Sequence, residues 1–145
     1  SGLVGSEMCI RDSILIDCPP SLGLLTLNAL TAAHYLIIPV QAQFLAMRGM
    51  AKITNVVATV RERLNPALEI GGIVITQFDG RKTLNKSVAE LVKDAFCDKV
   101  FQTVIRDNVS LAEAPIKGKD IFEYSRNSNG AKDYMALAQE VLKLK

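Results

Sequence analysis

The chain has 145 residues, of which 49% are hydrophobic and 22% are charged, and its formal net charge is +2. This length and composition suit one globular α/β domain with a real core. A net charge this small gives no argument by itself for a nucleic-acid or membrane partner. The three cysteines form no C-x-x-C pair, so neither a disulfide framework nor a zinc site is indicated. No apolar run approaches the roughly 18 residues of a membrane span.

The first residues of the chain have neither helical nor strand periodicity over a useful length. They do not form a signal peptide, because no basic segment precedes a long apolar core. Residues 3–13 resemble a translated sequencing adaptor. We therefore expect residues 1–12 to be a non-native or disordered tail, and residues 13–145 to form the domain.

The stretch from Ile14 to Asp17 is apolar and β-prone, and it ends in a carboxylate. Two prolines follow and forbid the strand from continuing, because proline lacks the N–H that a ladder needs. Ser21 then favours the start of a helix over about residues 22–33. A buried strand of this kind places Asp17 at the carboxyl edge of a sheet, where open α/β folds bind ligands. The alternative is that Asp17 binds no ligand and is only an acidic residue at the exposed end of a strand.

Strands and helices alternate along the rest of the chain. Near-continuous apolar runs, typical of a parallel sheet covered on both faces, predict strands at 35–40, 71–76 and 100–105. Apolar residues at three- and four-residue spacing predict a helix that ends at Asn65-Pro66, a second after a Thr83 cap, and a last one from about Tyr134. A short helix at 110–114 lies between loops at 117–120 and 125–130. In the second helix we expect the inward residues to be Leu84, Val88, Leu91, Val92 and Ala95. The alternation predicts a three-layer parallel sheet with flanking helices.

Several segments resemble the ParA/Soj family of partitioning ATPases, which have a P-loop NTPase fold of the ParA/MinD type. Residues 14–30 are similar to the family's Walker B and switch II segment. Later segments follow in the family's order, at Ile38–Gln41, Thr76–Arg81 and Asn108–Pro115. The family carries its phosphate-binding loop in an N-terminal half. The two glycines Gly71 and Gly72 do not form such a loop. They precede a strand, whereas a phosphate-binding loop follows a strand and opens a helix. The resemblance implies the C-terminal part of this fold, without ATP hydrolysis in the fragment itself.

The resemblance also implies ATP and Mg²⁺ as the cofactors of the complete protein. Asp17 would be the catalytic residue that anchors Mg²⁺ through a coordinated water, since Mg²⁺ keeps much of its hydration shell. Pro19, Pro20 and Gly23 would form the switch that senses the γ-phosphate, and a rigid strand-to-helix turn is the alternative. Further nucleotide-binding candidates follow the two later strands, which reach the same sheet edge. With Asp17, Pro19 and Pro20, they are Thr76, Phe78, Arg106, Asp107 and Asn108.

Three cations, Arg81, Lys82 and Lys86, are bunched around one predicted helix N-terminus. The resemblance implies a homodimer formed with ATP that binds double-stranded DNA without sequence preference, and these cations are the candidates for the DNA contact. A solvated helix face is the alternative. We also expect a ParB-like stimulating protein as a partner, and a cytoplasmic, nucleoid-associated bacterial location.

Two other functions are open on the sequence. A MinD-like membrane-cycling ATPase would add a basic amphipathic helix after the last domain helix, whereas this sequence ends at Leu142–Lys145. We therefore expect no membrane partner. The second alternative is a non-enzymatic, truncated scaffold.

Overall fold

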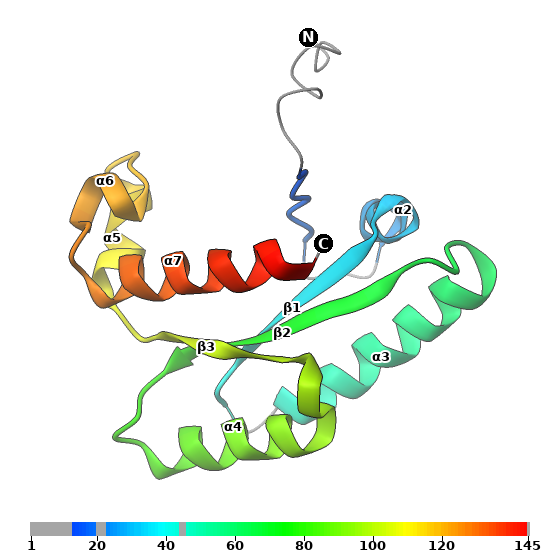
Figure 1. Ribbon diagram of the computed structural model, residues 1–145, viewed down its shortest axis with the longest axis horizontal. Helices are drawn as coiled ribbons and strands as arrows, with labels where there is room; N and C mark the ends of the chain where they lie inside the picture. The colour runs from blue at the N-terminus through cyan, green and yellow to red at the C-terminus, as the bar shows by residue number, and fades with distance from the viewer. Residues whose placement is uncertain (1–12, 20–22, 44–45, 145) are drawn as a thin grey trace, which may run out of the picture.

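The computed structural model describes residues 13–19, 23–43 and 46–144 (Figure 1). Its strands are β1 (Tyr35–Gln41), β2 (Glu69–Phe78) and β3 (Val100–Arg106). The helices of the first part of the chain are α2 (Leu24–Ala32), α3 (Ala46–Arg63) and α4 (Thr83–Phe96). Those of the second part are α5 (Val109–Ile116), α6 (Ile121–Ser125) and α7 (Asn129–Val141), and short 3₁₀ turns occupy Cys97–Lys99 and Leu142–Leu144.

The three strands form one parallel sheet in the order β1-β2-β3. Helices α3 and α4 cover one face, and α7 covers the other (Figure 1). This arrangement confirms the predicted three-layer sheet with flanking helices. None of the helices in the described ranges is long and apolar enough to cross a bilayer.

The central strand β2 supplies both layers of the core. Ile73 and Ile75 pack against α3 and α4, whereas Val74 packs on the opposite face with Phe101 and Ile105. Successive side chains of a strand point to opposite faces, so a strand that is covered twice must be apolar throughout. Gly72 belongs to this packing and not to a phosphate loop: a Cβ there would lie 2.3 Å from the ring of Phe101.

The predicted first strand is wrong. Residues 13–19 are not a strand in the structure, and Ile14, Leu15 and Ile16 are 65%, 84% and 54% exposed. A strand exists only where a neighbour completes its hydrogen bonds. In the described part of the chain, the sheet consists of β1, β2 and β3 alone. The predicted tail and the positions of Pro20 and Ser21 lie outside the described residues.

The helix predictions are correct in type but less accurate in their faces. Thr83 is the first residue of α4 and not its cap, which is Lys82. Leu84, Leu91 and Ala95 are exposed, because α4 turns Asn85, Val88, Ala89 and Val92 inward instead. Helix α6 was not predicted, and α7 begins at Asn129, inside a predicted loop.

Candidate functional site

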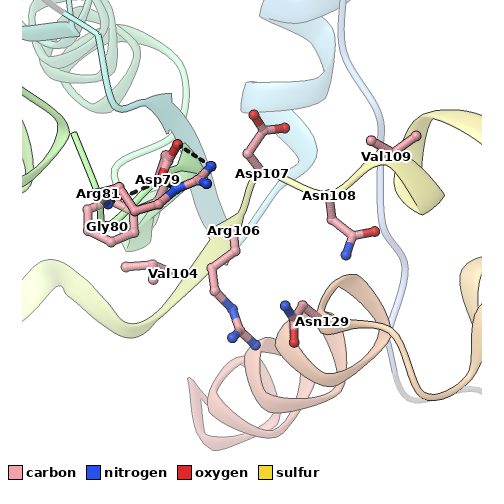
Figure 2. Close-up of a pocket in the computed structure, with 10 residues that line it drawn as sticks. Asp79, Gly80, Arg81, Val104, Arg106, Asp107, Asn108, Val109 and Asn129 are labelled. Carbon is pink, nitrogen blue, oxygen red and sulfur yellow. Dashed lines mark hydrogen bonds and ion pairs between the residues drawn. The ribbon is translucent and has the colours of Figure 1, made fainter.

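A shallow pocket of about 420 Å³ lies at the carboxyl edge of the sheet, between the ends of β2 and β3 (Figure 2). This is the edge at which parallel α/β sheets usually bind ligands. Its lining comes from the end of β2 and the turn after it, the end of β3, the start of α5 and the first residue of α7. The lining residues are Phe78, Asp79, Gly80, Arg81, Val104, Arg106, Asp107, Asn108, Val109 and Asn129.

Backbone and side-chain hydrogen bonds hold the three strand ends together at this edge. The Asp107 N–H donates to the Phe78 carbonyl at 3.1 Å, which joins the ends of β2 and β3. The buried side chain of Asn85 joins β2 to β1. Its Oδ1 accepts the Asp79 N–H at 2.8 Å, and its Nδ2 donates to the Ala42 carbonyl at 2.6 Å. Asn85, near the start of α4, therefore connects the residues that follow β1 and β2 beside the pocket.

Asp79 is the most strongly bonded acid of the site. Its carboxylate accepts two hydrogen bonds from the Arg81 guanidinium and one from the Arg81 backbone N–H, all at 3.0 Å. The Lys82 Nζ lies 3.9 Å from the same carboxylate. The hydrogen bonds from Arg81 lower the pKa of Asp79 to about 2. Asp79 is thus ionised at neutral pH, and it orients two of the three clustered cations.

Arg106 is committed to a different partner. Its Nη2 donates to the Asp133 carboxylate of α7 at 2.7 Å, and its Nε donates to the same group at 2.9 Å. This bonding raises the pKa of Arg106. Burial pushes the pKa of Asp133 upwards, but the bonds from Arg106 outweigh burial and the pKa is lowered. The guanidinium of Arg106 therefore links β3 to α7.

Asp107, Asn108 and Asn129 supply the remaining polar groups of the pocket. Figure 2 shows the Asp107 carboxylate and the Arg106 guanidinium on opposite sides of the end of β3. Asn108 caps α5, because its Oδ1 accepts the Ser110 N–H at 2.9 Å. Carboxylate and amide groups beside the apolar walls of Phe78, Val104 and Val109 suit a flat heterocycle with hydrogen-bonding edges.

The structure brings together only part of the predicted site. Phe78, Arg106, Asp107 and Asn108 line one pocket, and Arg81, predicted for DNA, lines it as well. Thr76 pairs with Gln41 in the sheet, just upstream.

The switch candidates lie elsewhere. Asp17 and Pro19 are exposed outside the sheet, and neither lines this pocket. Gly23 is the N-cap of α2, and Pro20 is outside the described residues.

A single carboxylate fits Mg²⁺ only if other ligands complete the coordination. Among residues 13–19, 23–43 and 46–144, no group of three or more His, Cys, Asp or Glu side chains could hold a metal ion. Mg²⁺ is commonly bound by one or two carboxylates together with substrate phosphates and waters. Asp17 thus has the right donor chemistry for a Mg²⁺ ion that arrives with a nucleotide. When bound, such an ion would neutralise charge on the phosphates.

Three residues that build or line the candidate site were not predicted from the sequence. Asn85 stands three, four and seven residues before Val88, Ala89 and Val92, so a polar residue on the apolar face of α4 was the available signal. Asp133 occupies the same kind of position on α7, four residues before Leu137. Asn129 carried no signal beyond its place in a polar loop.

Comparison with known proteins finds relatives that match about 90% of this chain. A family described as an AAA domain matches residues 10–70. The sporulation initiation inhibitor protein Soj of Bacillus subtilis is 50% identical over 130 residues, which are 90% of this chain and 51% of that protein. The chromosome partitioning protein ParA of Myxococcus xanthus is 44% identical over 91% of this chain and 47% of its own length. The chain therefore spans about half the length of these relatives.

Solved structures give the same result for the fold. The cell division ATPase MinD of Pyrococcus furiosus matches with a TM-score of 0.74 and 26% identity, over 97% of this chain and 55% of that one. Cobyrinic acid a,c-diamide synthase of Mycobacterium smegmatis, with bound ADP and magnesium, matches with a TM-score of 0.68 and 34% identity, over 88% and 44%.

Proposed function

Because the chain belongs to the ParA/Soj family of P-loop ATPases, we propose that it is part of an ATPase that partitions chromosomes or plasmids. In this proposal the complete protein dimerises with ATP, binds DNA without sequence preference and responds to a ParB-like stimulating protein at the bacterial nucleoid. The 50% identity to Soj carries the proposal. The likeness to MinD is more distant, at 26% identity, and so favours a membrane-cycling function less.

The pocket between β2 and β3 is the proposed site of the purine of ATP. Its walls combine the Phe78 ring with the polar groups of Asp107, Asn108 and Asn129. Arg106 contributes by holding the end of β3 to Asp133, and Thr76 by keeping β2 in register with β1. Asp107→Ala should weaken ATP binding in the complete protein because it removes a polar group from the pocket. Asp98→Ala, in the turn before β3, is the matched control and should leave ATP binding unchanged.

Asp17 is the proposed Mg²⁺ anchor, and Pro19, Pro20 and Gly23 are the proposed switch. In the 145-residue chain, Asp17 is exposed outside the sheet, so its carboxylate is not held beside the pocket. We therefore expect calorimetry to detect no appreciable binding of ATP–Mg²⁺ to this chain, and no hydrolysis. Micromolar binding would contradict this part of the proposal.

A fusion with the N-terminal half of the Bacillus subtilis relative tests the role of Asp17 directly. The fusion should have a slow, dimer-dependent ATPase activity. Asp17→Asn keeps the shape of the side chain and removes its charge, and it should reduce the metal affinity about 10–100-fold. Wild-type turnover by the Asn variant would show that the metal is anchored by another residue.

The proposed DNA surface is the start of α4, where Arg81 and Lys82 are held by Asp79 and Lys86 is exposed. In the fusion with ATP, replacement of all three by Ala should weaken duplex binding equally for all sequences. Each lost phosphate contact should make the log–log salt dependence shallower by roughly 0.9. A control that removes three exposed cations from α3, Lys52, Arg61 and Arg63, should leave the slope unchanged. An unchanged slope for the α4 variant would place the DNA surface elsewhere.

A further inference from the structure

Backbone N–H groups on the outer edge of β3 are hydrogen-bonded to side chains of α7. Among the strands that the structure describes, β3 pairs with β2 alone, on one side. An unpaired strand edge presents a row of N–H and C=O groups and so invites pairing with another chain. Here the N–H groups of Gln102, Thr103 and Arg106 all donate to carboxylates of α7.

Two acidic side chains make these bonds. Glu140 uses both oxygens, with Oε2 accepting the Gln102 N–H and Oε1 the Thr103 N–H, each at 2.8 Å. The Asp133 Oδ2 accepts the Arg106 N–H at 3.0 Å, in addition to its bonds with the Arg106 guanidinium. Gln102 and Thr103 lie between the β2–β3 pairs Ile73–Val100 and Ile75–Val104, where the register shifts, so their two consecutive N–H groups both reach Glu140 instead of alternating between the two edges. The carboxylates therefore occupy N–H groups of β3 that would otherwise be available to another chain.

The spacing of these residues along α7 matches their partners along β3. Asp133 and Glu140 are two helical turns apart, which is about 10.5 Å of helix, on the same side of α7. Three to four residues of strand cover about 10–13 Å. Leu137, between the two acids, packs with Val141 on the cluster of Phe101 and Ile105, which keeps α7 against the sheet.

We propose that α7 closes the outer edge of β3 against strand addition by a second copy of this chain. In the described sheet β1 is the other edge strand, and it faces no strand on its outer side. An uncovered β3 edge on one copy could therefore pair with the β1 edge of the next. Such a head-to-tail contact does not close and would build a growing sheet. This inference does not depend on the proposed ATPase function.

Amide hydrogen exchange of the 145-residue chain tests the contacts. Glu140→Ala should speed exchange at Gln102 and Thr103 about tenfold, the effect of losing one ordinary hydrogen bond at each. It should leave Arg106 unchanged, whereas Asp133→Ala should act on Arg106 alone. Glu90→Ala, which removes an exposed acid from α4, is the matched control and should change none of the three. Unchanged exchange at Gln102 and Thr103 in Glu140→Ala would overturn the inference.

Sedimentation of the double variant Asp133→Ala/Glu140→Ala tests the consequence. Its average mass should rise with concentration well beyond that of the wild type, and exchange at the three amides should slow as the concentration rises. The same mass as wild type at every concentration, with the three amides exchanging fast, would also overturn the inference. If the double variant does not melt cooperatively, Glu140→Gln replaces it. That variant retains one acceptor oxygen, so it should speed only one of the two amides, and faster exchange at neither would count against the inference.

Discussion

Asn85 and Asp79 fix the turn between β2 and α4 by different means. Asn85 is a neutral side chain, 7% exposed, whose amide is satisfied by one donor and one acceptor of the backbone. Asp79 is an ionised side chain whose bonds go to Arg81 and Lys82. The first therefore holds the strand ends, and the second orients the cations.

Replacement of Asn85 by Ala should destabilise the chain by about 1–3 kcal/mol, because the Asp79 N–H and the Ala42 carbonyl lose their buried partner. Asn55→Ala, at an exposed position of α3, gains the same helix propensity and should stay within about 0.5 kcal/mol of wild type. Urea unfolding measures both. Equal midpoints for the two variants would mean that the Asn85 amide is dispensable.

Asp79 should make stability depend on acid pH. The folded protein holds the pKa of Asp79 at about 2, below its ordinary value of 3.8. Its contribution is therefore complete above about pH 4 and is lost as the pH falls towards about 2. Thermal melts of Asp79→Asn should show a smaller loss of stability across this window than wild type does. Glu90→Gln is the control, and a wild-type slope in Asp79→Asn would argue against a role for this carboxylate.

At the scale of elements, the sequence predicted whether a segment is a helix or a strand better than it predicted which side of a helix is buried. Strands β1, β2 and β3 and helices α3 and α4 all have the predicted type. The face of α4 was misjudged because Leu84 and Leu91 are seven residues apart and outweigh Asn85 in any count of apolar residues. Periodicity identifies an amphipathic helix, but a buried polar residue can be placed only once its bonding partners are known.

Replacement by alanine should have opposite effects on stability at Gly72 and at Gly49. In β2, Gly72→Ala would put a Cβ 2.3 Å from the Phe101 ring, and such overpacking typically costs about 1–3 kcal/mol. In α3, a Cβ added at Gly49 would meet no described atom within 4 Å, so Gly49→Ala should stabilise the helix by about 0.5–1 kcal/mol. Urea unfolding of the two variants gives the signs. The same sign for both would show that the Phe101 contact does not control the β2 position.

At the scale of the whole molecule, local pattern and long-range pairing diverge at Ile14–Asp17. The pattern of these residues is that of a strand. The prediction failed because a strand also needs an adjacent strand to pair with, and the local pattern does not show whether one is present. The pocket between β2 and β3 was predictable in outline, since parallel strands bring their carboxyl ends to one edge. The Arg106–Asp133 pair was not, because its partners are 27 residues apart and on different elements.

The exposed apolar segment before α2 should affect association and not folding. Leu15 is 84% exposed, so Leu15→Ser should change the free energy of unfolding by no more than about 0.5 kcal/mol and should not lower the midpoint of thermal unfolding appreciably. It should also reduce aggregation at high concentration, because exposed apolar stretches recruit other chains. Light scattering during a thermal melt measures both effects. Ile38→Ser, at a position 3% exposed in the core, is the contrasting variant and should destabilise the fold by roughly 3 kcal/mol or more. A lower midpoint for Leu15→Ser would show instead that the segment packs on the domain.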